Sequence, residues 1–475
     1  MAKHQIQNWL EEIDTEISDY DLSDVEDLEQ LLENNTDVLE NNDFLENIFD
    51  GTDQIFENVF ANPEVDDSEI DQNLLDEEPC CSTQSKPKKV IHFVTPDIDW
   101  QSCLPNPPTE EYTPLQYFKF FFSDEMFDLI HLETNKYAIQ KNASTAKISY
   151  SEIQQYVGIL VFIGVVKMPA TRLYWSNNCR YNKIVDVMSR NRFSTISRYF
   201  HVEDNTTAKG PSSVNYDKLH KVRPLLNILQ SNMHDIPPEE KHSVDEQMIA
   251  FKGRSHLKQY FLPEPGLMYD FEIYQRKGTC PETGLGFSGD IVMALTSELP
   301  KGKNFKVYFD NWFSSLQLSV ALKERQIFCI GRGSYDFKVE TENNISLVRW
   351  FDRKSINFLS TYTSVEPLGT CKRWSISDKK FIEVQRPHVV EEYNKFMGGV
   401  DLADMLLELY RIDIRSNKWY MRIIFWVIGV CIVNGWLLYR RHLKQRKEKL
   451  KMSLLEFQTN IAAALCEVTV TRKRG

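Results

Sequence analysis

A run of 17 residues without a charged side chain, IIFWVIGVCIVNGWLLY at 423–439, constrains the fold most. A helix that is apolar on all sides must be surrounded by apolar groups, either lipid or protein. A membrane-spanning helix needs about 20 apolar residues, with about 17 as the lower limit. This run contains Asn434, charges flank it, and no other segment has a membrane-protein pattern. We therefore expect a buried core helix rather than a membrane span.

Charge is divided unevenly along the chain, although the formal net charge is −13. Residues 1–79 contain 26 acidic side chains and a single basic one, Lys3, which gives −25. The other 396 residues contain 42 acidic and 54 basic side chains, which gives +12. A basic body of this kind is typical of proteins that contact nucleic acid or membrane surfaces. The alternative is an ordinary enzyme with a solubilising acidic tail.

The first 110 residues are predicted to be a disordered acidic tail and linker. They are acidic and rich in asparagine, and they end in the proline-spaced segment TPDIDWQSCLPNPPTEEYTP. Apolar residues recur among the acidic ones, as in Leu28, Leu31 and Leu32. Acidic-hydrophobic alternation is typical of segments that fold on a protein partner. The tail could equally cover a basic surface of its own chain.

The cysteines and the basic runs indicate the cellular compartment of the protein. None of the nine cysteines has zinc-site spacing, and the N-terminus lacks the apolar core of a signal peptide. Unpaired cysteines without such a signal indicate a reducing compartment. Basic runs at 86–89, 440–451 and 472–474 are candidates for nuclear import or phosphate contact, or are solvated helix faces. We expect a nuclear protein.

Hydrophobic periodicity divides the rest of the chain into four segments. Helical spacing dominates 111–240 and continues after residue 401 to about residue 465; we place the second helical segment at 401–450 and a basic C-terminal tail at 451–475. Between them, 241–400 mixes strands and helices, with a small inserted β meander. The expected strands are at 242–253, 268–275 and 304–310, the helices at 288–299 and 314–325, and the meander at 337–340, 345–350 and 355–361.

Three aspartates recur in similar settings. Asp245 lies within SVDEQMIAF, Asp310 ends the expected strand KVYFD, and Asp401 begins the helical pattern DLADMLLELY. Magnesium prefers carboxylate oxygens, and two such ions can polarise the attacking and leaving oxygens of a phosphodiester. However, aspartate is also a favoured N-cap, and two of these residues precede helices. Spacing alone does not choose between a metal site and helix capping.

The segments around these aspartates carry a resemblance. In order, SVDEQMIAFKGR, KVYFDNWFSS and YNKFMGGVDLADM strongly resemble the three acidic motifs of the piggyBac transposase family. The resemblance extends through the flanking segments RNRFSTISRYFHVED, DKLHKVRPLL, EPLGTCKRW and RSNKWYMRI. It covers about residues 112–445. Long matched blocks in the same order are more specific than any isolated pair of acidic residues.

The resemblance implies an α+β fold in which an RNase H-like catalytic core is inserted in an all-helical DNA-binding and dimerisation region. It implies Asp245, Asp310 and Asp401 as catalytic residues, which together with Asp404 would bind Mg²⁺ (or Mn²⁺). The reaction would be DNA transposition: strand nicking, hairpin formation and joining at TTAA sites. The partner would be double-stranded DNA bound by a homodimer, without a membrane.

Lysine and arginine side chains on this framework are expected to contact phosphates. The residues selected are Arg190, Arg192, Arg198, Lys252, Arg254, Lys372, Arg373, Arg415 and Lys418.

The sequence also departs from the family pattern. FLPEPGLMYDFEIYQ follows the first aspartate motif almost directly, so an internal strand of the core is expected to be missing. A basic segment that family members have is shortened at 327–337, and the family's cysteine-rich zinc-binding domain is not expected after residue 445. Three functions therefore stay open. The first is a transposase-type nuclease and strand transferase, and the second is a domesticated, inactive DNA-binding or chromatin protein. The third is an interaction protein that uses only its acidic tail.

Overall fold

The protein is described by a computed structural model. The described residues are 93–96, 98–143, 147–210, 213, 216–249, 257–264, 266–273, 280–333, 343–351, 355–375, 379–416 and 418–467. All of them belong to one compact unit within Glu64–Gly475. The predictions for most of the acidic tail, for Lys252 and Arg254, for the strand at 337–340 and for the basic runs at 86–89 and 472–474 lie outside the described residues.

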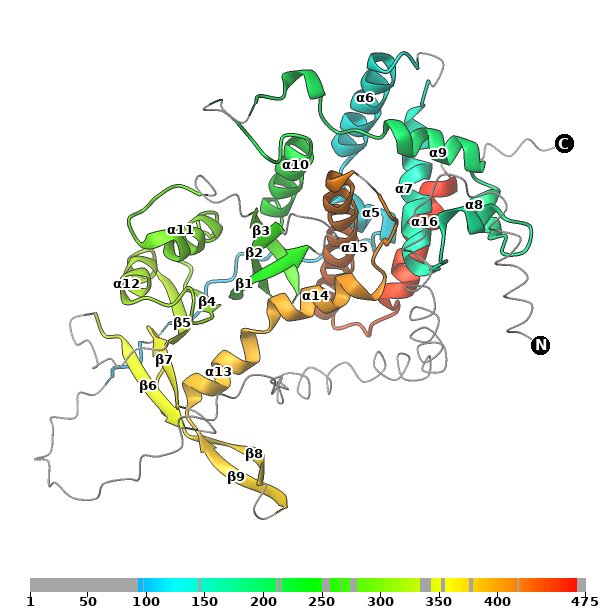
Figure 1. The fold of residues 1–475 in the computed structure, drawn as a ribbon. Coiled ribbons are helices and arrows are strands. Elements are labelled where there is room, and N and C mark those ends of the chain that lie inside the picture. Colours follow the sequence, from blue (N-terminus) through cyan, green and yellow to red (C-terminus); the bar gives the residue numbers. More distant parts are fainter. Residues whose placement is uncertain are drawn as a thin grey trace, which may run out of the picture. The chain divides into compact units, whose positions relative to one another are not determined.

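A seven-stranded sheet forms the centre of the 241–400 segment, in the order β3-β2-β1-β4-β5-β7-β6 (Figure 1). Strands β1, β4 and β5 run parallel to one another, and the other neighbouring pairs are antiparallel. Helices separate the parallel strands in the chain, as a parallel connection requires. The strands are β1 (Lys241–Ile249), β2 (Leu257–Glu264), β3 (Leu267–Ile273), β4 (Phe305–Phe309), β5 (Ile327–Gly333), β6 (Ser346–Phe351) and β7 (Ser355–Ser360).

The expected loss of an internal strand is wrong. Strand β2 lies between β1 and β3 and pairs with both of them, so the ladder is continuous on this side of the sheet. The register shifts between Phe261 and Pro263, because proline cannot donate a ladder hydrogen bond. Two strands of the expected meander, β6 and β7, form an antiparallel pair, and β7 also pairs with β5, which adds both to the main sheet.

Helices cover both faces of the sheet, and the alternation of β4 fixes which side chains meet them. Phe305, Val307 and Phe309 share an apolar core with residues of α11 (Gly286–Leu295) and α12 (Leu316–Glu324). Tyr308 points to the other face, where it packs with α13 (His388–Phe396). The strand end that carries Asp310 is therefore held from both sides.

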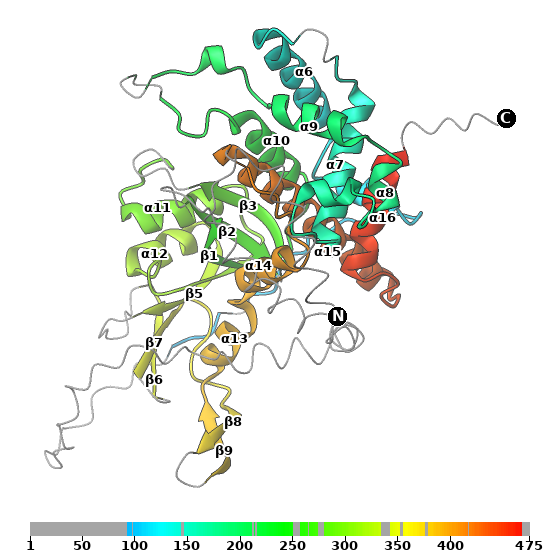
Figure 2. The same cartoon turned by 45° about the vertical axis from the view of Figure 1, so that its right-hand side comes forward.

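The helical part packs around one large apolar core that also includes β3 (Figure 2). The strand lies against α10 and α15, so the helical part and the sheet are joined along one edge. The helices of this part are α5 (Pro114–Lys119), α6 (Asp124–Gln140), α7 (Tyr150–Val165), α8 (Asn182–Val185), α9 (Arg190–Tyr199), α10 (Arg223–His234), α14 (Gly399–Leu409), α15 (Trp419–Arg446) and α16 (Leu454–Glu467), with short 3₁₀ turns at Thr171–Trp175 and Asn205–Thr207.

The expected basic tail at 451–475 is corrected for its first half by α16. Leu454, Phe457, Ile461 and Leu465 are buried at helical spacing, and the helix packs against α7. Its start carries a capping box, because the Ser453 hydroxyl accepts from the Glu456 N–H while the Glu456 carboxylate accepts from the Ser453 N–H. Its apolar stripe therefore completes the helical core.

Helix α15 contains the uncharged run 423–439, and it is long and apolar enough by composition to cross a membrane. In the structure it is mostly buried among other helices and β3, as expected for a core helix. Two hydrogen bonds explain why the buried polar residue Asn434 lies inside this apolar run. Its Oδ1 accepts from the Met268 N–H at 3.0 Å and its Nδ2 donates to the Met268 carbonyl at 2.8 Å. Since β3 is an edge strand, Asn434 supplies the hydrogen bonds that a further strand would have made.

Replacing Asn434 with leucine should therefore destabilise the protein. Two buried backbone groups of Met268 would lose their partners, at about 2–4 kcal/mol of unfolding free energy in total. Urea denaturation followed by circular dichroism measures this loss. The buried neighbour Ile432 provides a control, since Ile432→Val removes one methyl group and should cost about 0.5–1.5 kcal/mol. Equal losses for both variants would show that the Asn434 hydrogen bonds contribute nothing beyond packing.

Candidate metal and nucleic-acid site

The ends of two parallel strands bring the first two aspartates together. Strands β1 and β4 pair from Lys241 opposite Lys306 to Val244 opposite Phe309. Val244 and Phe309 form the last pair of this ladder, and Asp245 and Asp310 each follow it by one residue. Val244 and Phe309 both face the core under α11 and α12, so alternation directs the residue after each of them toward the side that carries α13. The carboxyl ends of parallel strands are a common place for such a site.

Helix α14 brings the other two acidic residues to the same region. It packs on β1 and β2, with Asp401 in its first turn and Asp404 one turn further along. The β2–β3 turn lies against this helix at Gly266, where an added Cβ would be 3.3 Å from the Leu402 side chain. Gly266 also has φ +84°, which favours glycine at this position. A side chain at Gly266 would therefore strain this turn and press on Leu402 of the helix that carries both aspartates.

The structure also resolves the alternative role of helix capping. The N-cap of α14 is Gly398, with Asp401 three residues further along, and no side chain caps this helix. The N-cap of α12 is Ser315, whose hydroxyl accepts from the Leu318 N–H at 3.1 Å. Neither Asp310 nor Asp401 is therefore used as a helix cap, which leaves their carboxylates available for other contacts.

Electrostatics show that the carboxylates lie close enough to interact. Burial, together with the negative charges of Asp310 and Asp401, raises the pKa of Asp245 to about 6, although a hydrogen bond from the Glu246 N–H opposes this shift. Burial, followed by the charges of Asp401, Asp245 and Glu408, raises the pKa of Asp404 to about 7. Burial also raises the pKa of Asp401. Such raised values are typical of like charges gathered in a partly buried site.

Tyr393 of α13 belongs to the same cluster, although no pattern in the sequence distinguishes this tyrosine from others. Burial raises the pKa of its phenol, as do the negative charges of Asp310, Asp245 and Asp401. Its ring packs edge-on against Phe358 with centroids 5.3 Å apart. The phenol therefore stays neutral beside the carboxylates and can donate a hydrogen bond there. Tyr393 is the first residue of the motif YNKFMGGVDLADM, and the resemblance of this motif implies roles only for its aspartates.

These residues fit a hard divalent cation by their chemistry. Asp404 Oδ1 is buried and has no hydrogen-bond partner among the described residues. A buried carboxylate oxygen without a partner is costly, and a metal ion is one of the few groups that satisfies it. Among the described residues, however, no group of three or more His, Cys, Asp or Glu side chains is arranged to hold a metal. The acidic residues are gathered without forming a closed coordination shell.

A buried polar cluster around Glu392 positions the strands that carry Asp245 and Asp310. Glu392 Oε2 accepts from Tyr308 and Tyr362 hydroxyls at 3.4 Å each, and the two hydroxyls lie 2.8 Å apart. The same oxygen lies 3.5 Å from Lys241 Nζ. Lys241 is in β1 and Tyr308 in β4, so one carboxylate of α13 links both strands. The cluster also fixes the neighbouring Tyr393.

Of the basic residues expected to contact DNA, four have exposed side chains. Arg190 and Arg198 lie near opposite ends of α9, Arg415 precedes α15, and Lys372 lies on β8 (Gly369–Ser375). Their exposure is consistent with phosphate contact, which stays a prediction.

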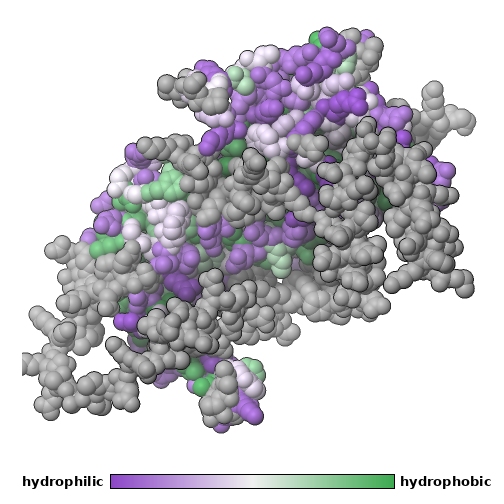
Figure 3. Space-filling model, viewed as in Figure 1, coloured by the Kyte–Doolittle hydropathy of each residue, from purple (hydrophilic) through white to green (hydrophobic). Residues whose placement is uncertain are grey.

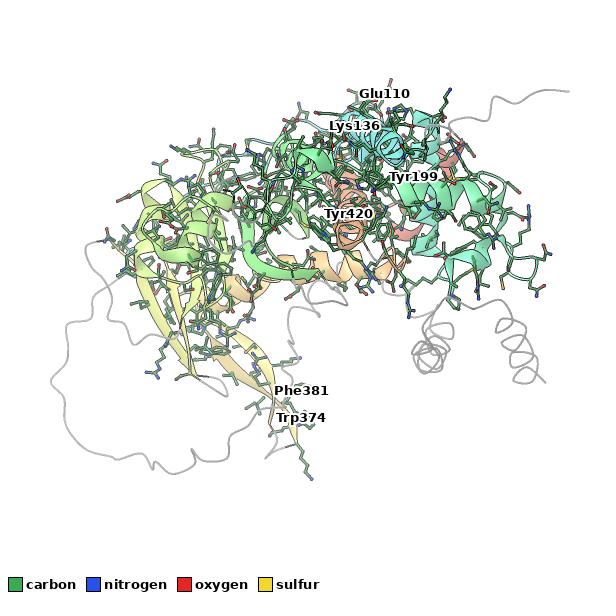
Figure 4. All side chains as sticks on the ribbon, turned by 45° about the horizontal axis from the view of Figure 1, so that its top comes forward. Glu110, Lys136, Tyr199, Trp374, Phe381 and Tyr420 are labelled. Carbon is green, nitrogen blue, oxygen red and sulfur yellow. The ribbon has the colours of Figure 1, made fainter. Side chains whose placement is uncertain are left out.

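The other three described basic residues are engaged inside the protein. Arg192 forms a bidentate ion pair with Glu152 of α7, with nitrogen-oxygen distances of 2.6 and 2.8 Å. Lys418 Nζ donates to the carbonyls of Ser197 and Arg198 at the end of α9, and lies 5.9 Å from the ring centroid of Tyr420, which Figure 4 labels. Burial, then the charge of Lys221, lowers the pKa of Lys418 to about 8.

Arg373 stacks over the Trp350 ring, with its guanidinium carbon 5.9 Å from the ring centroid. Arg192, Lys418 and Arg373 therefore hold elements of the fold together, whatever else they contact.

Comparison with known proteins adds to this geometry. Residues 113–436 match the family model described as Transposase IS4. Similar curated proteins from Homo sapiens are PiggyBac transposable element-derived protein 3, 28% identical over 414 residues, and protein 2, 27% identical over 401 residues. Each alignment covers 76% of this chain, and it covers 67% and 66% of these relatives, so the chain spans about two thirds of their length.

A solved structure with a similar fold is the cryo-EM structure of the piggyBac transposase synaptic complex with hairpin DNA. Its TM-score is 0.62 at 23% sequence identity, and the match covers 76% of this chain and 82% of that one. At this identity the similarity shows a shared mixed α and β fold.

Replacing Glu392 with alanine should loosen the strand ends. The variant removes the common acceptor of two tyrosines and leaves Lys241 without its carboxylate, at about 2–3 kcal/mol of unfolding free energy. Chemical denaturation measures the change. Its neighbour Glu391 pairs with Arg386 in a more exposed position, so Glu391→Ala should cost at most about 1 kcal/mol. A Glu392→Ala loss no larger than the Glu391→Ala loss would contradict the role of the cluster.

The raised pKa of Asp404 predicts a pH-dependent stability. In the folded protein its pKa is about 7, against about 3.9 in an unfolded chain. The folded state therefore holds a proton that the unfolded state has lost, and stability falls as the pH rises between these values. The Asp404→Asn variant cannot titrate at this position, so it should not show this fall in stability with rising pH. Its unfolding free energy should exceed that of the wild type by on the order of 1 kcal/mol at pH 8, after allowance for solvent screening, and by less at pH 5.

Urea denaturation at both pH values, without divalent ions, tests this prediction. Adding Mg²⁺ at pH 8 should stabilise the wild type and reverse the advantage of the asparagine variant. Glu324→Gln, which changes an exposed acid at the end of α12 outside this cluster, serves as the control and should show neither effect. A stability difference between Asp404→Asn and wild type that is the same at pH 5 and pH 8 would refute the assignment.

Proposed function

Because the chain belongs to the piggyBac-type transposase family, we propose that it binds double-stranded DNA and cleaves and rejoins its strands with divalent metal ions at TTAA sites. The observation that carries the proposal is the gathering of Asp245, Asp310, Asp401 and Asp404 from three separate elements. An ordinary structural site would pair such acids with basic residues. Here the pKa values of Asp245, Asp401 and Asp404 are raised instead.

Asp245, Asp310, Asp401 and Asp404 would hold the metal ions, with Mg²⁺ or Mn²⁺ as the natural choices for an all-oxygen site. Bound there, the ions would polarise the phosphodiester and its attacking oxygen. The side chains of the protein prepare this site. The ladder between strands β1 and β4 ends next to the first two aspartates, and Glu392 holds those strands against α13. The Tyr393 phenol stays neutral at its edge.

The sheet order supports an RNase H-like core. Three antiparallel strands (β3, β2, β1) followed by two parallel ones (β4, β5) place the first two aspartates at the centre of the sheet. We propose that this core is inserted between the helical segments 111–240 and 401–450, and that these segments bind DNA and form a homodimer. The exposed Arg190, Arg198 and Arg415 support contact with phosphates.

A nuclear location is proposed on the basic composition and on this DNA substrate. The basic run at 440–451 supports a nuclear location less than its composition indicates, because part of it is engaged in the fold. Arg441 donates to the Pro237 carbonyl and the Tyr269 hydroxyl, and Arg446 donates to the carbonyls of Pro108 and Glu110. Two arginines of this run therefore stabilise the fold.

A domesticated DNA-binding or chromatin protein without cleavage activity is the second candidate. It is favoured by one observation, the lack of a preformed metal-holding group among the described side chains. In that case the carboxylates would be retained from an ancestral site, and the basic surface alone would act on DNA. A protein partner of the acidic N-terminal tail would suit either function.

Strand cleavage separates the two candidates. Purified protein with Mg²⁺ should nick a duplex that carries a TTAA-flanked transposon end, and Asp310→Asn should reduce the rate by at least about 100-fold. Gel analysis of end-labelled DNA measures the rate. Glu324→Gln, an exposed acid at the end of α12, should nick as fast as the wild type.

Binding of the same duplex should weaken steeply with salt, because lysines and arginines displace counterions from phosphates. Salt-dependent binding without nicking by the wild type would favour the inactive protein. Nicking that is equally fast with Asp310→Asn would refute the assigned site, and an affinity that does not change with salt would refute both candidates.

A further inference from the structure

A two-stranded sheet separate from the main sheet lies between β7 and α13. Strands β8 (Gly369–Ser375) and β9 (Lys380–Arg386) pair only with each other among the described strands (Figure 1). An isolated hairpin is marginally stable in water, so contacts with the rest of the protein must hold it.

One face of this hairpin is attached to the main sheet. Cys371, Arg373 and Val384 are half-buried, at alternating positions that share a face. Arg373 stacks over Trp350 of β6, and Trp350 Nε1 donates to the Gln385 carbonyl at 3.2 Å. These contacts fix the base of the hairpin, so its opposite face is presented in a defined orientation.

The opposite face carries an uncovered aromatic pair. Trp374 and Phe381 are directly opposite each other, 49% and 66% exposed, with ring centroids 5.2 Å apart and an interplanar angle of 73°. Figure 4 shows both at the end of the hairpin, away from the rest of the sheet. The pair stabilises the hairpin to some extent, but that role does not require half of each ring to stay in water.

Lysines lie on and near this face. Lys372 is exposed on the aromatic face and Lys379 is exposed directly before β9, whereas the exposed Lys380 pairs with Ser375 and lies on the other face. Glu383, opposite Lys372, is the one acidic residue on the described strands β8 and β9. Figure 3 shows hydrophobic and hydrophilic surface side by side at this end of the molecule. Aromatic rings among lysines are typical of surfaces that bind single-stranded nucleic acid, where bases stack on the rings and phosphates meet the cations. An apolar groove of a protein would instead strip water from the lysines without pairing them.

The hairpin is continuous with the carboxylate site. Strand β9 passes through Pro387 into α13, and the Arg386 guanidinium pairs with Glu391 of that helix at 3.1 Å. Tyr393, beside the aspartates, lies two residues further along. A DNA strand that leaves the carboxylates along α13 would therefore meet the hairpin.

We propose that Trp374 and Phe381 form a stacking platform for unpaired bases of DNA, with Lys372 and Lys379 on the adjoining phosphates. The platform rests on the proposed function and deepens it, because it assigns the hairpin to DNA that is locally opened rather than to duplex. Strand nicking and hairpin formation both produce such unpaired bases.

Two DNA substrates test the platform with the full-length protein. One is a duplex, and the other is the same duplex with an unpaired stretch that contains 2-aminopurine, whose fluorescence falls on stacking. Trp374→Leu with Phe381→Leu keeps apolar bulk and removes the rings. It should weaken binding of the unpaired substrate about 10-fold or more and abolish the fluorescence change, while duplex affinity changes less than about 2-fold.

Two variants serve as controls. Trp374→Phe with Phe381→Trp exchanges the rings and should bind like the wild type. Ile139→Ser alters an equally exposed apolar residue on α6 and should also bind like the wild type.

The outcomes separate this inference from the proposed function. If the wild type binds neither DNA, both fail. If the wild type binds duplex but the double leucine variant binds unpaired DNA equally tightly, the platform alone is refuted. An equal loss for both substrates also refutes it, because the hairpin would then act only through its fold or charge. If the leucine variant changes only the oligomeric state, as measured by sedimentation, the face is an interface between copies.

Discussion

A cluster of partly buried carboxylates is the constraint on which the rest of this structure depends. Asp245, Asp401 and Asp404 have raised pKa values because they are partly buried, and for Asp245 and Asp404 also because of nearby negative charges. Such a cluster opposes folding unless a cation or protons neutralise it. The protein must therefore hold strands β1 and β4 and helix α14 together by interactions elsewhere. The cost of the cluster is itself a reason to connect it with function, because a purely structural site gains nothing from it.

Two buried polar contacts provide this support. Glu392 connects Lys241 of β1, Tyr308 of β4 and Tyr362 after β7, so that α13 holds both parallel strands. At the edge of the sheet formed by β3, Asn434 of α15 makes the hydrogen bonds that the backbone of Met268 would otherwise lack. The sheet is thus fixed to the helical part at one edge and to α13 near its centre. Helix α14 runs between these two attachments and carries Asp401 and Asp404.

Much of the secondary structure could be predicted from local patterns. Alternation identified β1, β3, β4, β6 and β7, and the apolar run identified α15 as a core helix. Strand β2 was missed because the segment appeared shortened against the family pattern and contains Pro263, while its pairing with two neighbours decides its conformation. The helical pattern that extends to about residue 465 agrees with α16, but the assignment of 451–475 to a basic tail did not take into account that Ser453 and Glu456 form a capping box at the start of this helix.

The candidate site could be predicted only in part. Periodicity left Asp310 and Asp401 equally suited to helix capping, and only the resemblance to a family selected them as ligands. The structure shows Ser315 and Gly398 at the cap positions instead. Tyr393 and Glu392 could not be selected from the sequence, because their significance comes from partners on strands far away in the chain. For the same reason, Arg192 and Lys418 could not be recognised as residues that hold α9 in place.

The central claim is that the four aspartates form one metal site. Crystals grown with Mn²⁺ and measured at the manganese absorption edge test it most directly, since anomalous scattering locates manganese without assumptions about the ligands. The claim predicts an anomalous peak within about 2.0–2.3 Å of carboxylate oxygens from β1, β4 and α14. Manganese bound only elsewhere on the protein, with no peak among Asp245, Asp310, Asp401 and Asp404, would contradict it.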